Sequence, residues 1–418
     1  MNQFDHLILL IGKNPLPNYV TAKYFLRHVT RLKSIIAACS KDTREIAGRL
    51  EKVLRRQFPD LSFDFNYIEL DNPSDAIGIR LQIQQVISTP QRKNSKIHLN
   101  YTGGTKNMVV HAYLSVFVNT AEGNAFYSYL DAREFRLKYD ENQPDSPDLR
   151  PEIDLPLQDL LELHDCDTGK IAREPDWTAA NAIFQNWIIE GLIIDFLQWR
   201  DDFLTPYFFD TEHRKIPAKK LNNPLEMTGF SSSPFFDRVN VLLPSLPPQQ
   251  SWHFADSDKL ILAESGAKYD EWFKVIEYLD GKWLEYYIYD LILQKGSTHW
   301  KVSWGRHVKR HGAARDFEID VLVLNGYQLC GISVTTANRR SHYKTKAFEI
   351  LHRVTQMGGE EARAVLVTTI DKMRVEELKE DVQMDTGAGE NLLILGLEDL
   401  RPDMLWPAIH HHITGGRK

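Results

Sequence analysis

The sequence has little of what marks secreted, zinc-stabilised or membrane-spanning proteins. Its 418 residues include three cysteines, Cys39, Cys166 and Cys330, which lie far apart and form no C-x-x-C pair. This spacing argues against a disulfide framework and against structural zinc, and it favours a reducing compartment. No stretch approaches the roughly 18 uninterrupted apolar residues of a membrane-spanning helix. We therefore expect a cytoplasmic protein without a membrane partner.

Positively charged residues are fewer than negatively charged ones. Lys and Arg number 50 against 57 Asp and Glu, which gives a formal net charge of −7. This balance excludes bulk electrostatic capture of nucleic acid, so any nucleic-acid binding must come from a local patch. The run WGRHVKRHGAAR, residues 304–315, is a candidate for such a patch. The N-terminal MNQFDHLILLIG has no basic start, and we expect it to form a buried strand and not a secretory signal.

The length predicts two or three domains. Residues 1–150 alternate short apolar strands with helices, which indicates an α/β domain of Rossmann-like type. The stretch that begins at Asp140 is acidic and rich in proline, and it marks the first boundary. We expect a linker and a helical insert over 151–265, with one long amphipathic helix over 178–203, and a second α/β domain over 266–418.

The most informative stretch is KIHLNYTGGTKNM, residues 96–108. It is typical of a strand, a Gly-Gly turn and the start of a helix. Two glycines let backbone N–H groups converge on a ligand, and the helix N-terminus that follows favours phosphates. The Thr102 and Thr105 hydroxyls and the Lys106 ammonium suit the same role. On spacing alone, an ordinary turn with Thr105 as helix cap is the simpler interpretation.

The segment YTGGTKNM resembles the signature loop of CARF domains, the CRISPR-associated Rossmann-fold sensors of cyclic oligoadenylates. The N-terminal LILLIGKNPLPNYVTAKYF resembles the first strand and ligand-contacting loop of the same family, in the branch that carries a nuclease-like C-terminal domain. Both loops would lie at the carboxyl ends of strands, near the switch point of a doubly wound sheet. The ligand site that this resemblance implies consists of Gly12, Lys13, Asn14, Thr102, Gly103, Gly104, Thr105 and Lys106.

Ser40 has two interpretations. The resemblance places it at the end of the second strand, where CARF domains contact their ligand. Its position three residues before Thr43, at the start of a helix that runs to about Phe58, predicts a helix N-cap instead. The cap is favoured on energetic grounds.

The C-terminal block resembles the PD-(D/E)xK fold of restriction-endonuclease-like nucleases. The order that carries the resemblance is a helix with Glu285, a strand with Asp320, a further strand, a helix and a strand. It implies carboxylates that hold Mg²⁺ or Mn²⁺ and a lysine near the attacked phosphate. A period of two puts Glu318 and Asp320 on one strand face, so these residues and Glu285 form the candidate catalytic metal site.

The chain departs from this pattern on the next strand. The positions of the expected Glu-x-Lys fall on Ser333 and Thr335, and neither residue can replace the missing carboxylate or ammonium. Lys344 and Lys346, at the start of the following helix, are candidates for a displaced catalytic lysine. A solvated basic helix start is the plainer interpretation of both.

Three functions remain open. The first is a type III CRISPR effector nuclease that cyclic oligoadenylate, with cyclic tetra-adenylate the expected ring, switches on against DNA or RNA. The second is a non-catalytic sensor whose degenerate nuclease domain binds nucleic acid or a protein partner, and the third is a ring nuclease that degrades the activator. A ring with internal symmetry matches a two-fold pair of sensors, so we expect a homodimer.

Overall fold

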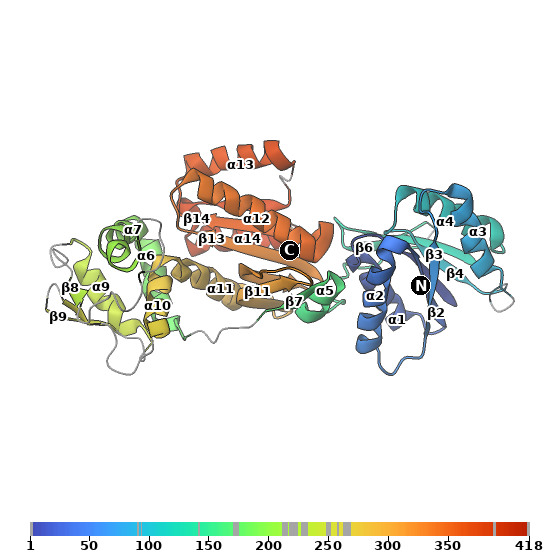
Figure 1. Ribbon diagram of the computed structural model, residues 1–418, viewed down its shortest axis with the longest axis horizontal. Helices are drawn as coiled ribbons and strands as arrows, with labels where there is room; N and C mark the ends of the chain where they lie inside the picture. The colour runs from blue at the N-terminus through green and yellow to red at the C-terminus, as the bar shows by residue number, and fades with distance from the viewer. Residues whose placement is uncertain are drawn as a thin grey trace.

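The computed structural model describes residues 3–89, 92, 94–140, 143–169, 175–210, 216, 225–226, 233–247, 252–256, 259–261, 269–387 and 390–415. Figure 1 shows an N-terminal sheet domain, a second sheet domain and a helical insert, which follow one another along the longest axis. Several parts of the insert expected over 151–265 lie outside the described residues.

The N-terminal sheet has six strands in the order β3-β2-β1-β4-β5-β6. All neighbours are parallel except β5 and β6, which form an antiparallel pair. The strands are β1 (His6–Leu10), β2 (Ser34–Ser40), β3 (Asp64–Leu70), β4 (Ile97–Asn100), β5 (Ala125–Asp131) and β6 (Arg136–Tyr139). The helices are α1 (Leu16–His28), α2 (Arg44–Gln57), which follows the short turn η1 (Lys41–Thr43), α3 (Ala76–Ile87) and α4 (Lys106–Asn119).

Alternation along the central strands builds two hydrophobic layers. Leu7 and Leu9 of β1 join the core beneath α1 and α2, whereas Ile8 and Leu10 join the core beneath α3 and α4. Successive side chains of a strand point to opposite faces, so a strand buried on both sides is apolar throughout. The Rossmann-like domain predicted from the sequence is confirmed.

The second sheet also has six strands, in the order β15-β14-β13-β12-β11-β7. The strands are β7 (Cys166–Thr168), β11 (Trp300–Arg310), β12 (Phe317–Asn325), β13 (Gln328–Thr335), β14 (Arg363–Thr368) and β15 (Leu392–Leu395). The helices and short turns around it are η7 (Tyr278–Lys282), α11 (Trp283–Lys295), α12 (Arg340–Gly358), η8 (Gly359–Glu361), α13 (Lys372–Thr386), η9 (Leu397–Asp399) and α14 (Pro402–Thr414). The chain is an α/β protein with a Rossmann-like domain and a nuclease-like α/β domain, as the sequence predicts.

The insert is a helical body beside the second sheet. Its elements are α6 (Thr178–Glu190), α7 (Ile193–Trp199), η2 (Arg200–Leu204), α8 (Thr205–Phe208), β8 (Leu225–Glu226), α9 (Phe236–Leu242), η5 (Leu243–Ser245), β9 (His253–Asp256), β10 (Lys259–Ile261) and α10 (Tyr269–Glu277). The single helix predicted over 178–203 is wrong. Gly191 takes the left-handed conformation, with φ of 76°, and ends α6 before α7 begins.

The N-terminal domain and the second sheet domain share one hydrophobic core. That core extends from beneath α1 and α2, through α5 (Leu157–Leu163), to the face of the second sheet that α12 covers. Phe135 meets Tyr327 edge-on at 6.1 Å between ring centroids, and Arg150 donates to Gln328 Oε1 at 2.9 Å. No helix in the described part of the chain is long and apolar enough to cross a membrane.

Candidate functional sites

The loops after β1 and β4 touch each other at the carboxyl edge of the sensor sheet. A Cβ placed on Gly12 would lie 3.0 Å from the Gly104 backbone nitrogen, and one placed on Gly103 would collide with the Leu10 carbonyl oxygen. Gly104 has a φ of +80°, a conformation that favours glycine. The juxtaposition expected from the sequence is therefore present, and it exposes backbone without side chains between the two loops.

Two lysines flank this contact. Lys13 on the first loop and Lys106 at the start of α4 are both exposed. Within the described ranges, neither ammonium has an acidic partner within ion-pair distance. Unneutralised ammonium groups beside free backbone N–H groups and a helix N-terminus favour an anionic ligand.

The hydroxyls expected at this site already have structural roles. Thr102 Oγ1 donates to Asn100 Oδ1 at 2.8 Å and accepts from the Leu130 N–H at 2.7 Å. Thr105 Oγ1 accepts from the Met108 N–H at 3.2 Å and caps α4, but the residue stays exposed. Ser40 is buried and forms a capping box with Thr43, whose Oγ1 accepts from the Ser40 N–H at 3.0 Å. The cap interpretation of Ser40 accounts for its burial.

Asn14 leaves the ligand loop for the second domain. Its Nδ2 donates to Glu361 Oε2 at 3.3 Å, and its Oδ1 accepts from the Leu16 N–H at 3.1 Å. The ring of His164, which follows α5, lies with Nε2 3.3 Å from the same Oδ1. Asn14 therefore joins the two domains, a role that its place in a short loop did not reveal.

Asn18 is a residue that sequence reasoning missed. It is fully buried in the first turn of α1, and its Nδ2 donates to the Leu10 carbonyl at 3.1 Å. The same nitrogen lies 3.0 Å from the position that a Cβ on Gly103 would take, so Asn18 packs directly against the glycine turn. An asparagine directly after Pro17 was the only signal.

The nuclease-like centre lies where α11 meets β12 and β13. Asp320 is 7% exposed, and its Oδ2 accepts from the Val334 N–H at 2.6 Å and from Ser333 Oγ at 3.1 Å. Glu285 of α11 accepts from the Trp304 indole N–H at 3.0 Å. Both donors to Asp320 reach Oδ2, and Trp304 reaches Oε2 of Glu285, so these hydrogen bonds use one oxygen of each carboxylate.

The two carboxyl groups perturb each other. Burial raises the pKa of Glu285 to about 8, and the negative charge of Asp320 adds to the rise. Burial also raises the pKa of Asp320, while the Lys346 ammonium opposes that rise. Glu285 faces a cavity on one side, and its carboxyl group is otherwise closely surrounded. Neighbouring carboxylates in an enclosed site bind a proton or a cation readily.

The charge of Glu318 adds to the rise in the pKa of Glu285, and its side chain lies beside β11. Its Oε2 is 3.8 Å from His307 Nε2, and His307 Nδ1 is 3.2 Å from Asp316 Oδ2. The basic run 304–315 forms the end of β11 and the turn to β12 at this place. Across the described residues, no group of three or more His, Cys, Asp or Glu side chains is arranged to hold a metal ion.

The structure separates the two candidate lysines on α12. Lys344 lies 3.1 Å from Asp385 and 3.6 Å from Asp381, both on α13. Lys346 is half-buried, and its charge acts on Asp320. The ammonium near the carboxylate pair is therefore that of Lys346.

A cavity of about 740 Å³ opens beside Glu285 between the insert and the second sheet. Arg200 from the insert closes one wall, where it donates to the Asp280 carbonyl and to Thr336 Oγ1, both at 2.8 Å. Arg339 and His342, at the start of α12, line the opposite side. This cavity gives Glu285 access to a ligand from solution.

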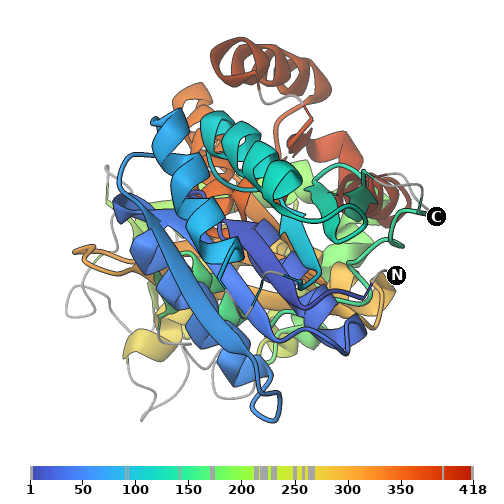
Figure 2. The ribbon, with the colours of Figure 1, turned by 90° about the vertical axis from the view of Figure 1, so that its right-hand side faces the viewer.

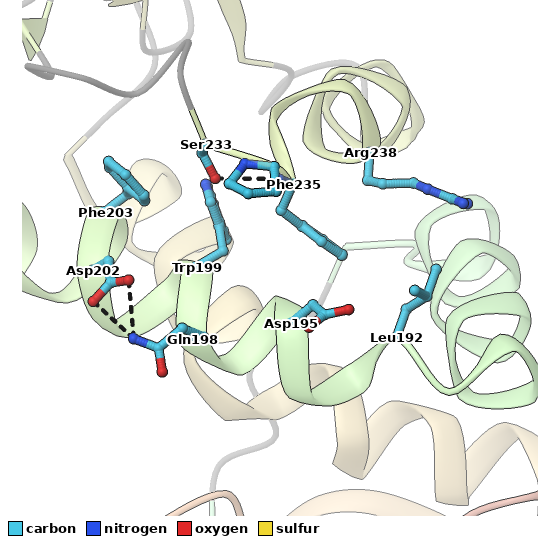
Figure 3. Close-up of a pocket in the computed structure, with 10 residues that line it drawn as sticks. Leu192, Asp195, Gln198, Trp199, Asp202, Phe203, Ser233, Phe235 and Arg238 are labelled. Carbon is cyan, nitrogen blue, oxygen red and sulfur yellow. Dashed lines mark hydrogen bonds between the residues drawn. The ribbon is translucent and has the colours of Figure 1, made fainter.

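A second cavity, of about 600 Å³, lies within the insert. Figure 3 shows Trp199 and Phe235 turned toward it and Gln198 donating to both oxygens of Asp202, at 3.0 and 2.9 Å. It lies among α7, η2 and the start of α9, apart from both sites described above.

Comparison with known proteins agrees with this architecture. No protein-family model matches the sequence, and no curated protein matches it. The crystal structure of protein VC1899 from Vibrio cholerae matches with a TM-score of 0.72 at 16% identity, over 99% of each chain. Can2 from Sulfobacillus thermosulfidooxidans, solved in complex with cyclic tetra-adenylate, matches with a TM-score of 0.67 at 14% identity, over 98% of this chain and 99% of its own. The chain shares their fold along nearly its whole length.

Proposed function

We propose that this chain, whose fold is that of a CARF sensor joined to a nuclease-like domain, binds a cyclic oligoadenylate that switches on a metal-dependent nuclease in type III CRISPR defence. The observation that carries the ligand class is the contact of Gly12 with Gly104 between the exposed ammonium groups of Lys13 and Lys106. Such a surface suits the phosphates of a nucleotide ring. The cyclic tetra-adenylate bound to Can2 supports the same ligand for this chain.

The sensor domain offers a surface for a second copy of the chain. Figure 2 shows α3 and α4 side by side on the outer face of the sensor domain. Both helices expose apolar side chains at helical spacing, namely Ile77, Leu81, Val110, Leu114, Phe117 and Val118. An apolar face of this kind commonly marks a protein interface. A two-fold pair formed through it places two copies of the Lys106 loop near each other, so we propose a homodimer with one shared ligand.

The carboxylate pair fits a hard divalent cation. Glu285 and Asp320 are enclosed oxygen donors with raised pKa values, and a bound Mg²⁺ or Mn²⁺ compensates both charges. When bound, such a cation supplies Lewis-acid polarisation of the phosphodiester and activation of water. Trp304 orients Glu285, Ser333 and the Val334 N–H hold Asp320, and Lys346 supplies positive charge for the attacked phosphate. The basic run 304–315 would guide the DNA or RNA strand to this place.

One observation favours a second candidate, a sensor without catalysis. Ser333 occupies the position where a PD-(D/E)xK site has a carboxylate, and its hydroxyl instead donates to Asp320. A site with two acids in place of three holds a metal less tightly. In this case the nuclease-like domain binds nucleic acid or a protein partner without cleaving it.

The test is a cleavage assay on single- and double-stranded DNA and RNA with Mn²⁺ or Mg²⁺, in the presence and absence of cyclic tetra-adenylate. We expect cleavage that depends on both the ring and the metal, and that Asp320→Ala abolishes without changing ring binding. Ring binding without cleavage of any substrate would establish the second candidate.

A further inference from the structure

Asn14 of the loop after β1 donates a hydrogen bond into the second domain. Asn14 Nδ2 donates to Glu361 Oε2 at 3.3 Å, across 347 positions of sequence. The fit is close, because a Cβ on Gly359 would collide with the Asn14 amide. Gly359 also has a φ of +73°, so both its conformation and its neighbour require glycine. A shift of the loop toward η8 would therefore displace Gly359.

The hydrogen bond from Asn14 stabilises the buried carboxyl group of Glu361. Its side chain is only 4% exposed, and burial raises its pKa to about 7. The Asn14 amide is the side-chain donor that opposes this rise. A buried carboxyl group that loses a hydrogen-bond donor is destabilised, so the position of Asn14 changes the stability of η8.

Glu361 stands at the end of the helix that serves the nuclease-like centre. α12 runs from Arg340 to Gly358 and leads directly into η8. It carries Lys346 and Arg353, whose charges act on Asp320, and Arg353 also donates to the Glu318 carbonyl at 2.9 Å. A continuous helix of 19 residues moves as one body more readily than it bends.

On its N-terminal side, Asn14 is two residues from the proposed ligand site. Gly12, two residues earlier, rests on Gly104, and Lys13 lies between them and Asn14. Lys13 also lines an interdomain cavity of about 410 Å³ together with Arg49, Arg310 and Met357. This space allows the loop to move when a ligand engages Lys13.

We propose that the Asn14–Glu361 hydrogen bond transmits ligand binding from the sensor loop to α12, which then repositions Lys346 relative to Asp320. The inference deepens the proposed function and rests on it for the ligand and its place. Asn14 acts as a positioning residue through Glu361, and it needs no direct contact with substrate. The motion of α12 can be measured whether or not the chain cleaves nucleic acid.

The experiment is amide hydrogen–deuterium exchange of the full chain with and without cyclic tetra-adenylate. In wild type, the ring changes exchange in residues 340–358. Asn14→Asp sets a carboxylate against Glu361, and at saturating ring we expect the exchange change in α12 to be lost. Adding Glu361→Gln to Asn14→Asp restores a donor–acceptor pair in the reverse sense and restores the exchange change.

Asn72→Asp is the matched control. Asn72 Oδ1 accepts from the Ser74 N–H at 2.9 Å, in a sensor loop turn like that of Asn14, and this variant keeps the wild-type response. Glu361→Gln alone retains the shape and weakens the acceptor, so we expect a reduced response. The inference is overturned if the bound ring leaves the exchange of α12 unchanged in wild type, or if the change persists in Asn14→Asp. Failure of wild type to bind the ring contradicts the proposed function instead.

Discussion

Three glycines bring the two sensor loops together, and each is required for a different reason. Gly12 approaches a backbone nitrogen, Gly103 approaches a carbonyl oxygen, and Gly104 has a positive φ. Backbone N–H groups that no Cβ shields can donate to phosphate oxygens, and the nearby ammonium groups strengthen that interaction. The affinity of the sensor should therefore respond to changes in both the turn and the charge.

At Lys106, truncation should weaken ring binding without harming the fold. We expect Lys106→Ala to reduce the binding free energy of cyclic tetra-adenylate by about 1 to 3 kcal/mol, the range of a charge-assisted hydrogen bond. Isothermal titration calorimetry measures this loss. Lys379 on α13, which pairs with Glu376 far from the loop, serves as control, and Lys379→Ala should bind as wild type does. Equal affinities of the two variants would mean that the loop is an ordinary turn without a role in ring binding.

At α12, the two neighbouring lysines should differ in their effect on cleavage. Lys346→Ala removes the ammonium near Asp320 and should lower the rate by about 10²- to 10³-fold, the range for loss of one preorganised charge partner. Lys344→Ala breaks surface ion pairs with α13 and should leave the rate within about twofold. Single-turnover cleavage with the ring bound measures both rates. A larger loss in Lys344→Ala would show that the displaced lysine has been placed wrongly.

At Glu285, the raised pKa makes stability depend on pH in a definite direction. Between the ordinary pKa of 4.5 and the folded value of about 8, the folded state holds a proton that the unfolded state has released. This contribution to stability is therefore lost as pH rises through that window. We expect Glu285→Gln to melt higher relative to wild type at pH 8 than at pH 5.5, by differential scanning fluorimetry. A difference that is constant with pH would contradict the raised pKa.

The same site should bind metal in competition with the proton. We expect Mn²⁺ to raise the melting temperature of wild type at pH 8 more than at pH 5.5, because the cation needs ionised carboxylates. Asp320→Ala should show no such gain at either pH. An equal gain in wild type and in this variant would place the metal elsewhere.

Local chemistry made some of these residues predictable. Gly103, Gly104 and Lys106 belong to one strand–turn–helix segment, whose geometry follows from its own sequence. The choice between Lys344 and Lys346 needed the structure, since two positions along a helix point to nearly opposite sides and only packing decides which side faces Asp320. The partner of Asn14 was hidden because Glu361 lies 347 residues away.

At the scale of elements, strongly periodic segments agree best with the structure. The strand and the helix start predicted within residues 96–108 are β4, Ile97–Asn100, and the beginning of α4, Lys106–Asn119. β7 escaped prediction, because three residues carry no period and the strand exists only by pairing with β11. The break at Gly191 was missed because the apolar pattern continues on both sides of it.

The exposed apolar face of α3 and α4 gives a prediction at this scale. We expect Phe117→Glu to convert a homodimer into a monomer and to weaken ring binding, because an ionised carboxylate on the apolar face opposes burial. Light scattering at micromolar concentration measures the change. Met384 on α13 is 83% exposed, so Met384→Glu is the control and should stay dimeric. A wild type that is monomeric with and without the ring would remove the dimer from this account.

At the scale of the whole molecule, the continuous core between the two domains is the feature that the sequence concealed. Phe135 and Tyr327 belong to segments that periodicity assigns to separate sheets, yet they pack together. Apolar pattern shows that a face is buried but not what buries it. This shared core places the loop after β1 within hydrogen-bonding reach of η8.

The central claim is that the sensor domain binds a cyclic oligoadenylate, and calorimetric titration of the purified chain with cyclic tetra-adenylate tests it most directly. The account predicts saturable binding with one ring for every two chains. It also predicts that Gly104→Val, whose side chain would meet Leu10 and Met108 and cannot keep the positive φ of the turn, abolishes binding by displacing the turn while circular dichroism shows the rest of the fold retained. The absence of saturable binding in wild type, or undiminished binding in Gly104→Val, would contradict it.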